Sequence, residues 1–118
     1  MKTLQDTFNV VVTHLRKQMC KSINEYCDCL YRGPDNKKCA LGILIPDEMY
    51  DVNLEHHSLG TGTRLDQCFY ELGYTKEDFE ALNKLQIIHD NYNVSEWEDQ
   101  FRKFAGDYDL VYSYEYYI

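Results

Sequence analysis

The sequence predicts an α+β fold that is mostly helical, with about four helices and one small β-hairpin in a single domain, residues 1–118. Apolar residues recur every three or four positions in four segments, which is the period of an amphipathic helix. One turn-forming stretch separates two short runs that favour strands. A chain of 118 residues is long enough for one hydrophobic core, and its length is typical of one domain.

The first predicted helix covers residues 4–22. Asp6 near its start and Arg16 and Lys17 near its end complement the helix dipole. Spacings of three and four place its apolar residues on one stripe. The stripe contains Leu4, Phe8, Val11, Val12, Leu15 and Met19.

We predict the β-hairpin over residues 29–45, with a turn at 33–37. Pro34 and Asp35 suit the centre of a type I turn, and Asn36 tolerates a positive φ. A two-stranded hairpin is only marginally stable in isolation. We therefore expect it to pack on a helix.

Three further helices are predicted, over residues 63–72, 76–90 and 96–105. Each has a residue at its start or just before it that can cap the first turn, namely Thr63, Thr75 and Ser95. Residues 51–62 form the longest predicted loop. Residues 110–118 alternate well enough for a strand or an extended tail.

The net charge of −8 is unevenly distributed along the chain. Residues 1–46 hold seven Lys/Arg and four Asp/Glu, whereas residues 47–118 hold five and sixteen. Such an acidic half repels phosphates, so we expect no direct nucleic-acid binding and favour a protein partner with a basic surface. Net charge of this size also serves solubility alone. Neither a membrane span nor a signal peptide is recognisable, which predicts a cytoplasmic protein without a membrane partner.

Metal binding is the first alternative to a binding role. Zn²⁺ requires four converging ligands, which usually come in two closely spaced pairs. One close cysteine pair is present, and it has no matching second pair. The spacing therefore predicts no metal and no cofactor. The residues that would supply ligands if the prediction were wrong are Cys27, Cys29, Cys39, His56 and His57.

Catalysis by cysteine and histidine is the second alternative. It requires a thiolate held next to a base, and nothing in the spacing brings His56 or His57 to a particular cysteine. The carboxylates of Asp47 and Glu48 follow Pro46, where they suit the first turn of a helix. An enzyme is therefore less favoured than a binding protein, and no catalytic residue is assigned.

The C-terminus is rich in tyrosine and acidic residues. Tyrosine offers a large, rigid contact area, and acidic neighbours steer a basic partner. A terminal strand that covers the core would have the same composition. The residues predicted to bind a partner are Asp107, Tyr108, Asp109, Tyr112, Tyr114, Glu115, Tyr116 and Tyr117.

Residues 29–50 carry the pattern C-x-Y-R…K-C-A-x-G-x-L-I-P-D-E-x-Y. This pattern resembles small uncharacterised proteins of tailed bacteriophages and prophages. Asn36 stands where the pattern has Gly, and it keeps a left-handed turn accessible. Residues 85–90 and the helix with Trp97 are also similar. Within the motif we expect Arg32 to pair with Asp47 or Glu48.

The resemblance implies a phage-type protein made in the host cytoplasm, and it implies no reaction. By analogy with small acidic phage proteins, we predict an accessory protein that binds and inhibits or redirects a host protein. A defence or nucleic-acid-processing protein is the expected class of target, and DNA mimicry is a special case. The alternative is a small zinc-binding or cysteine/histidine-dependent enzyme.

Overall fold

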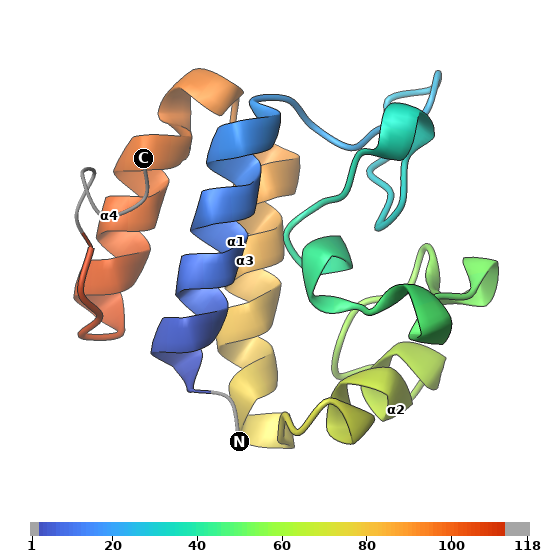
Figure 1. The fold of residues 1–118 in the computed structure, drawn as a ribbon. Coiled ribbons are helices and arrows are strands. Elements are labelled where there is room, and N and C mark those ends of the chain that lie inside the picture. Colours follow the sequence, from blue (N-terminus) through green and yellow to red (C-terminus); the bar gives the residue numbers. More distant parts are fainter. Residues whose placement is uncertain (1–2, 113–118) are drawn as a thin grey trace.

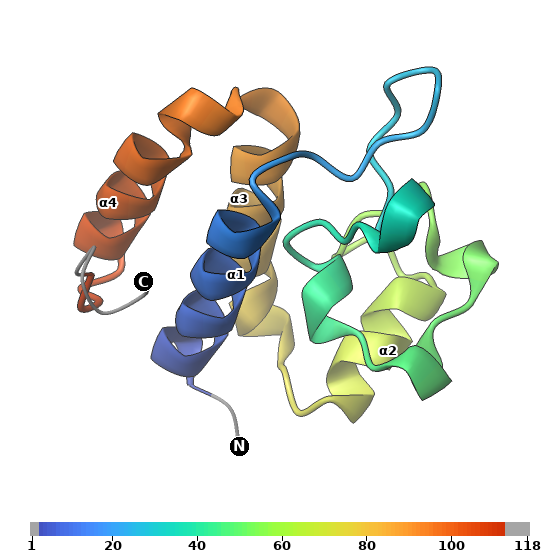
Figure 2. The same ribbon diagram turned by 45° about the horizontal axis from the view of Figure 1, so that its top comes forward.

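The structure is a computed structural model that describes residues 3–112. Its α-helices are α1 (Leu4–Gln18), α2 (Arg64–Glu71), α3 (Phe79–Asn91) and α4 (Trp97–Asp107). Helices α1, α3 and α4 form one group, and α2 lies on the other side of the molecule with several 3-10 turns (Figures 1 and 2). Within this range no helix combines the length and apolar character needed to cross a bilayer.

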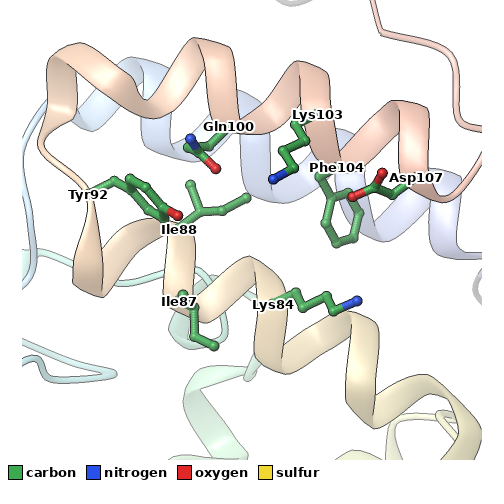
Figure 3. Close-up of a pocket in the computed structure, with 8 residues that line it drawn as sticks. All are labelled: Lys84, Ile87, Ile88, Tyr92, Gln100, Lys103, Phe104 and Asp107. Atoms are coloured by element: carbon green, nitrogen blue, oxygen red, sulfur yellow. The ribbon is translucent and has the colours of Figure 1, made fainter.

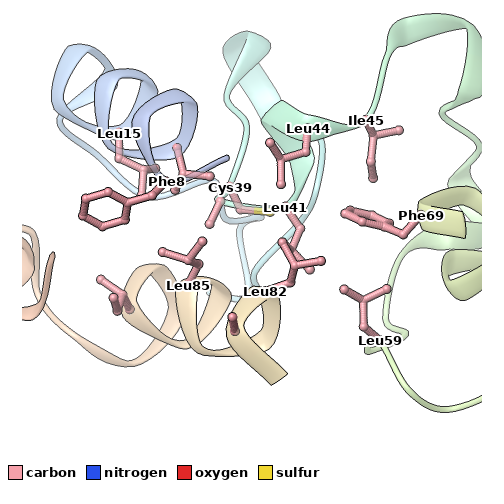
Figure 4. Close-up of a cluster of buried hydrophobic side chains, with 14 of the residues drawn as sticks. Phe8, Leu15, Cys39, Leu41, Leu44, Ile45, Leu59, Phe69, Leu82 and Leu85 are labelled. Carbon is pink, nitrogen blue, oxygen red and sulfur yellow. The ribbon is translucent and has the colours of Figure 1, made fainter. Parts of the chain in front are cut away.

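The hydrophobic core joins these two groups. It is one cluster of buried side chains to which every α-helix of the described range contributes. Leu41 and Cys39 lie between α1, α3 and Phe69 of α2, as Figure 4 shows. Phe8 of α1 stacks on Phe104 of α4 with ring centroids 5.5 Å apart. The apolar stripes read from the sequence are therefore the surfaces that pack together.

The predicted β-hairpin over residues 29–45 is wrong, and with it the α+β class. Residues 3–112 contain no strand, and their only β-type pairings are two isolated bridges, Ile23–Cys29 and Arg32–Lys38. The chain does reverse at residues 33–37, where the Gly33 N–H donates to the Lys37 carbonyl (2.9 Å). Pairing ends after one bridge, so the described fold is all-helical.

Side chains from distant elements replace the expected strand pairing. Backbone N–H groups must find acceptors when they are buried, and in this segment glutamine and glutamate side chains provide them. The pairs are Tyr31 N–H to Glu55 Oε1 (2.8 Å), Lys38 N–H to Gln18 Oε1 (2.9 Å) and Leu41 N–H to Gln86 Oε1 (2.9 Å).

Gly42 brings the segment back against itself. It begins a 3-10 turn, Gly42–Leu44, that packs on α1. A Cβ atom at this position would lie 2.0 Å from the Tyr31 carbonyl oxygen. The close approach of the two backbones therefore requires glycine.

The helix boundaries differ from the predictions by a few residues. Helix α1 ends at Gln18 instead of residue 22, because Met19 adopts a left-handed conformation (φ 57°) and caps it. The capping box with Thr75 is present as expected. The box before α4 uses Asn93 and not Ser95. Asparagine is an equally good cap residue, and it lies two positions before the predicted cap residue Ser95.

Candidate functional site: a polar pocket on helix α3

A pocket of about 440 Å³ lies between α3 and two irregular segments, and we call it the polar pocket. Three of the five alternative metal or catalytic candidates meet there: Cys29, His56 and His57. Tyr31, Asn83, Gln86 and Asp90 also line it. The fold thus brings together residues that no spacing rule connects.

The other two candidates are not part of the polar pocket. Cys39 is fully buried in the core, where its sulfur accepts the Gly42 N–H (3.3 Å) and burial raises the pKa of its thiol. Cys27 is exposed in a turn, with φ 65°. The structure therefore does not bring four of the five candidate ligands together in one site.

Near the end of α3, Asp90 lines the polar pocket, and His89 lies buried next to it. His89 is fully buried, and its Nε2 lies 2.9 Å from the Ser22 backbone nitrogen. Because that N–H can only donate, Nε2 must accept. The imidazole is therefore neutral, and its proton is on Nδ1, which donates to Asp90 Oδ1 (2.7 Å). The Gln86 side-chain amide donates to the same oxygen (2.7 Å).

Cys29 completes a cluster with these two residues. Its sulfur, a His89 nitrogen and an Asp90 oxygen lie within 4.8 Å of one another, which is close enough for three ligands of one metal ion. A metal would need a thiolate and a free ring nitrogen. Burial first, and then the neighbouring Asp90 carboxylate, raise the pKa of the Cys29 thiol to about 12. Both His89 nitrogens are already occupied, so this donor set does not fit a metal.

The same protonation states argue against covalent chemistry at Cys29. A nucleophilic cysteine needs a lowered pKa or an adjacent base. Here the pKa is raised, and the Asp90 carboxylate hydrogen-bonds the thiol and stabilises its neutral form. The cluster is arranged to hold the Asp90 carboxylate in a fixed position, which is a property of binding sites as well as of structural networks.

Glu55 holds the segment that carries Tyr31, one of the residues that line the polar pocket. Its buried carboxylate accepts the Tyr31 N–H (2.8 Å), the Arg32 N–H (3.1 Å) and the Tyr50 hydroxyl (2.7 Å). The Tyr31 hydroxyl in turn donates to the His57 carbonyl. Two backbone segments are thereby held in register around the polar pocket.

The side chain of Arg32, next to Tyr31, makes contacts within the motif. As expected, it pairs with Asp47, with 2.7 Å between Nη1 and Oδ1. Its guanidinium also donates to the Ile45 carbonyl (2.7 Å) and lies 4.9 Å from the centroid of the Tyr50 ring. These contacts join Arg32 to the second half of the motif over residues 29–50, in addition to the contacts that Gln18, Glu55 and Gln86 make with it from outside.

The residues predicted to bind a partner begin at the end of α4. Asp107 and Asp109 are exposed, and Tyr108 is half-buried against Phe104, with ring centroids 4.6 Å apart. Asp109 has φ 54° and ends the helix: the next N–H, of Leu110, donates to the Ala105 carbonyl (2.8 Å). This is a Schellman-type ending, so Asp109 has a structural role as well.

Tyr112 makes its contacts within the chain. Its ring packs edge-on against Phe8 (5.9 Å between centroids), and its hydroxyl accepts from Arg16 Nη2 (2.6 Å) and donates to Glu98. The remaining predicted residues, Tyr114, Glu115, Tyr116 and Tyr117, lie outside the described residues.

Two other hollows are present in the described range. One, of about 250 Å³, lies between α3 and α4, and its lining includes Lys84 of α3 and Lys103 and Phe104 of α4 (Figure 3). The other, which we call the acidic groove, has a volume of about 360 Å³. Its lining combines three carboxylates, Glu48, Asp51 and Glu71, and one cation, Arg64, with the apolar residues Met49, Leu54 and Cys68.

Sequence reasoning assigned no site role to His89 or Asp90. The available signal was a Gln and an Asp four residues apart on one helix face, which is the spacing of an interacting pair. Comparison with known proteins identifies no relative from which a role could be transferred: no family model, curated protein or solved structure matches the chain significantly.

Proposed function

We propose that the protein is a small acidic phage-type accessory protein that acts in the host cytoplasm. It binds a host protein through that protein's basic surface, and it inhibits or redirects its target. The observation that carries this proposal is the acidic groove, whose lining combines three exposed carboxylates and one arginine with apolar side chains. Apolar contact supplies affinity, and the charges select and steer a partner with exposed Lys or Arg.

The carboxylates of the groove are mostly available to a partner. Glu48 and Glu71 form no salt bridge with any residue of the range 3–112. Asp51 has one cation nearby, Arg64, at 3.7 Å, and both side chains are largely exposed. A surface pair of this kind contributes little to stability. Its rearrangement on binding would therefore cost little.

The C-terminal segment is the second proposed contact. Asp107 and Asp109 are exposed beside Tyr108, and further tyrosines follow in the sequence. A chain shortened to residues 1–112 retains every contact described above. Weaker binding by this chain would assign a role to residues 113–118, and unchanged binding would remove them from the site.

The protonation states of the polar pocket support binding over the alternative enzyme. A thiol with its pKa raised to about 12 and a neutral, doubly hydrogen-bonded imidazole do not form a nucleophile and base. No reaction is assigned to the protein.

Capture from a host lysate tests the proposed function. The tagged protein is incubated with a bacterial lysate, washed at moderate salt, and the retained proteins are identified by mass spectrometry. The proposal predicts one partner at near-stoichiometric yield, with an affinity that falls as salt rises. Competition by duplex DNA would identify the special case of a DNA mimic. Retention of no protein from any plausible host would contradict the proposal.

A further inference from the structure

We propose that the polar pocket receives a guanidinium group, so that an arginine side chain of the basic partner inserts beside Asp90. The assignment of this arginine to a partner protein rests on the proposed function. The chemistry of the pocket is independent of it and follows from the charge, the hydrogen bonds and the walls of the site.

The charge of the pocket favours a cation. Asp90 is the one carboxylate among its lining residues, and no Lys or Arg lines it. Lys21 approaches from behind and donates to the Asp90 backbone carbonyl (3.1 Å), so it does not occupy the carboxylate. The side chain of Asp90 is 29% exposed, which leaves it accessible from the pocket. The volume of about 440 Å³ lies within the range of ligand pockets.

Hydrogen-bond acceptors remain available around Asp90. Gln86 and the Nδ1 of His89 donate to Asp90 Oδ1, and the Cys29 thiol also hydrogen-bonds the carboxylate. A carboxylate has about four lone-pair sites, so part of its accepting capacity remains. Gln86 is occupied at both ends of its amide. Asn83 uses its nitrogen to donate to the Leu59 carbonyl (3.0 Å), so its oxygen remains as an acceptor. A ligand with several N–H donors can pair with these acceptors, and His56, His57 and Ser58 line the rest of the pocket.

Guanidinium is the side-chain group that matches these requirements best. It has five N–H donors, no acceptor and a planar shape that pairs with a carboxylate. Its weak hydration and flat faces suit a pocket with an aromatic and an aliphatic wall, here Tyr31 and Ile87. Burial raises the pKa of Tyr31, so its ring stays neutral beside the cation. An ammonium group is compact and strongly hydrated, and it gains less from such walls.

Titration of the isotope-labelled full chain with N-acetyl-arginine methylamide tests the pocket directly by NMR. The proposal predicts saturable shifts of the side-chain amide signals of Gln86 and Asn83. The lysine analogue should bind more weakly. The citrulline analogue, which has nearly the same shape without the charge, should leave both signals unchanged. Absence of saturable shifts with the arginine probe would overturn the proposal.

Asp90→Asn is the decisive variant. Asparagine keeps the oxygen that accepts from His89 and Gln86, while it removes the charge and replaces Oδ2 with a donor. We expect arginine affinity to fall at least tenfold, with the backbone amide spectrum otherwise preserved. Asp99→Asn on α4 removes an exposed carboxylate away from the pocket and should bind like the wild type. Equal affinity in Asp90→Asn would overturn the proposal.

A second variant covers the case in which Asp90→Asn does not fold. Ile87 is 45% exposed on the pocket wall, so Ile87→Lys adds a cation there without disturbing the core. The arginine shifts should then be lost, and retained shifts would contradict the proposed site. The probe needs no host protein, which separates the two proposals. If the chain binds the arginine probe but captures no host protein, the proposed pocket stands and the proposed function is refuted. If it captures a host protein but does not bind the probe, only the proposed pocket is refuted.

Discussion

Glu55→Ala tests how the irregular segment around residues 29–42 is held in place. The Glu55 carboxylate is 7% exposed and accepts hydrogen bonds from the backbone N–H groups of Tyr31 and Arg32. Alanine removes both acceptors without supplying others. The Tyr50 hydroxyl also loses its acceptor, but it lies close enough to the surface to turn toward water.

The expected cost follows from the two amides. A buried donor that loses its acceptor costs about 1–3 kcal/mol, so we expect the free energy of unfolding to fall by about 2–6 kcal/mol for the pair. This is a large fraction of the roughly 5–15 kcal/mol typical of a domain. For a chain of this length it corresponds to a decrease in melting temperature of about 8–24 °C.

Urea and thermal unfolding followed by circular dichroism provide the measurement. Glu77→Ala is the matched control, because Glu77 is exposed and its loss should change stability by less than about 0.5 kcal/mol. Glu55→Gln keeps one oxygen and should fall between the control and Glu55→Ala. A loss below about 1 kcal/mol for Glu55→Ala would refute the view that this side chain replaces a strand partner.

Three further predictions follow from the same structure. Gly42→Ala places a Cβ 2.0 Å from the Tyr31 carbonyl oxygen and should yield unfolded or strongly destabilised protein; a melting temperature like that of the wild type would contradict this close approach. Iodoacetamide at pH 8 should modify Cys29 about a thousandfold more slowly than an ordinary exposed thiol, because its pKa is raised to about 12; mass spectrometry would disprove this by showing equal rates at Cys29 and the exposed Cys27. Burial opposes ionisation of Glu98, but its hydrogen bonds from Arg16 and Tyr112 outweigh burial and lower its pKa. Glu98 should therefore stabilise the fold above about pH 4 and lose this effect as the pH falls through its lowered pKa. An unfolding difference from Glu98→Gln that is independent of pH would contradict it.

The helices were predictable because their packing depends on local periodicity. Phe8 and Leu15, Leu82 and Leu85, and Phe101 occupy the buried faces that their spacings indicate. The capping residue Thr75 was visible for the same reason, since a cap and its partner lie three positions apart. Periodicity and capping both depend on residues that lie within one or two helical turns of each other.

The hairpin prediction was wrong because the structure of residues 29–45 depends on residues that are distant in the sequence. The turn chemistry of residues 33–37 was interpreted correctly, and the chain reverses there. Whether strands follow depends on what the next N–H groups contact, and Gln18, Glu55 and Gln86 provide competing acceptors. No sequence pattern indicates which of these side chains will reach the segment.

The polar pocket illustrates the same limit. Cys29, His56 and His57 were singled out for their chemistry, and the fold brings them together through Tyr31 and Glu55. The protonation state of Cys29 depends on burial and on the nearby Asp90 carboxylate, which spacing does not reveal.

Charge reversal in the acidic groove tests the central claim most directly. The double variant Glu48→Lys/Glu71→Lys changes two exposed carboxylates of the groove that lack salt bridges in the described range. Glu25→Lys/Glu77→Lys makes the same change in net charge at exposed positions outside the groove. Binding of each variant to the captured host protein is measured by calorimetry at moderate salt. The proposed function predicts that the groove variant loses at least tenfold in affinity while the control stays within a fewfold of the wild type. Equal affinities for the two variants would contradict the claim that this groove binds the partner.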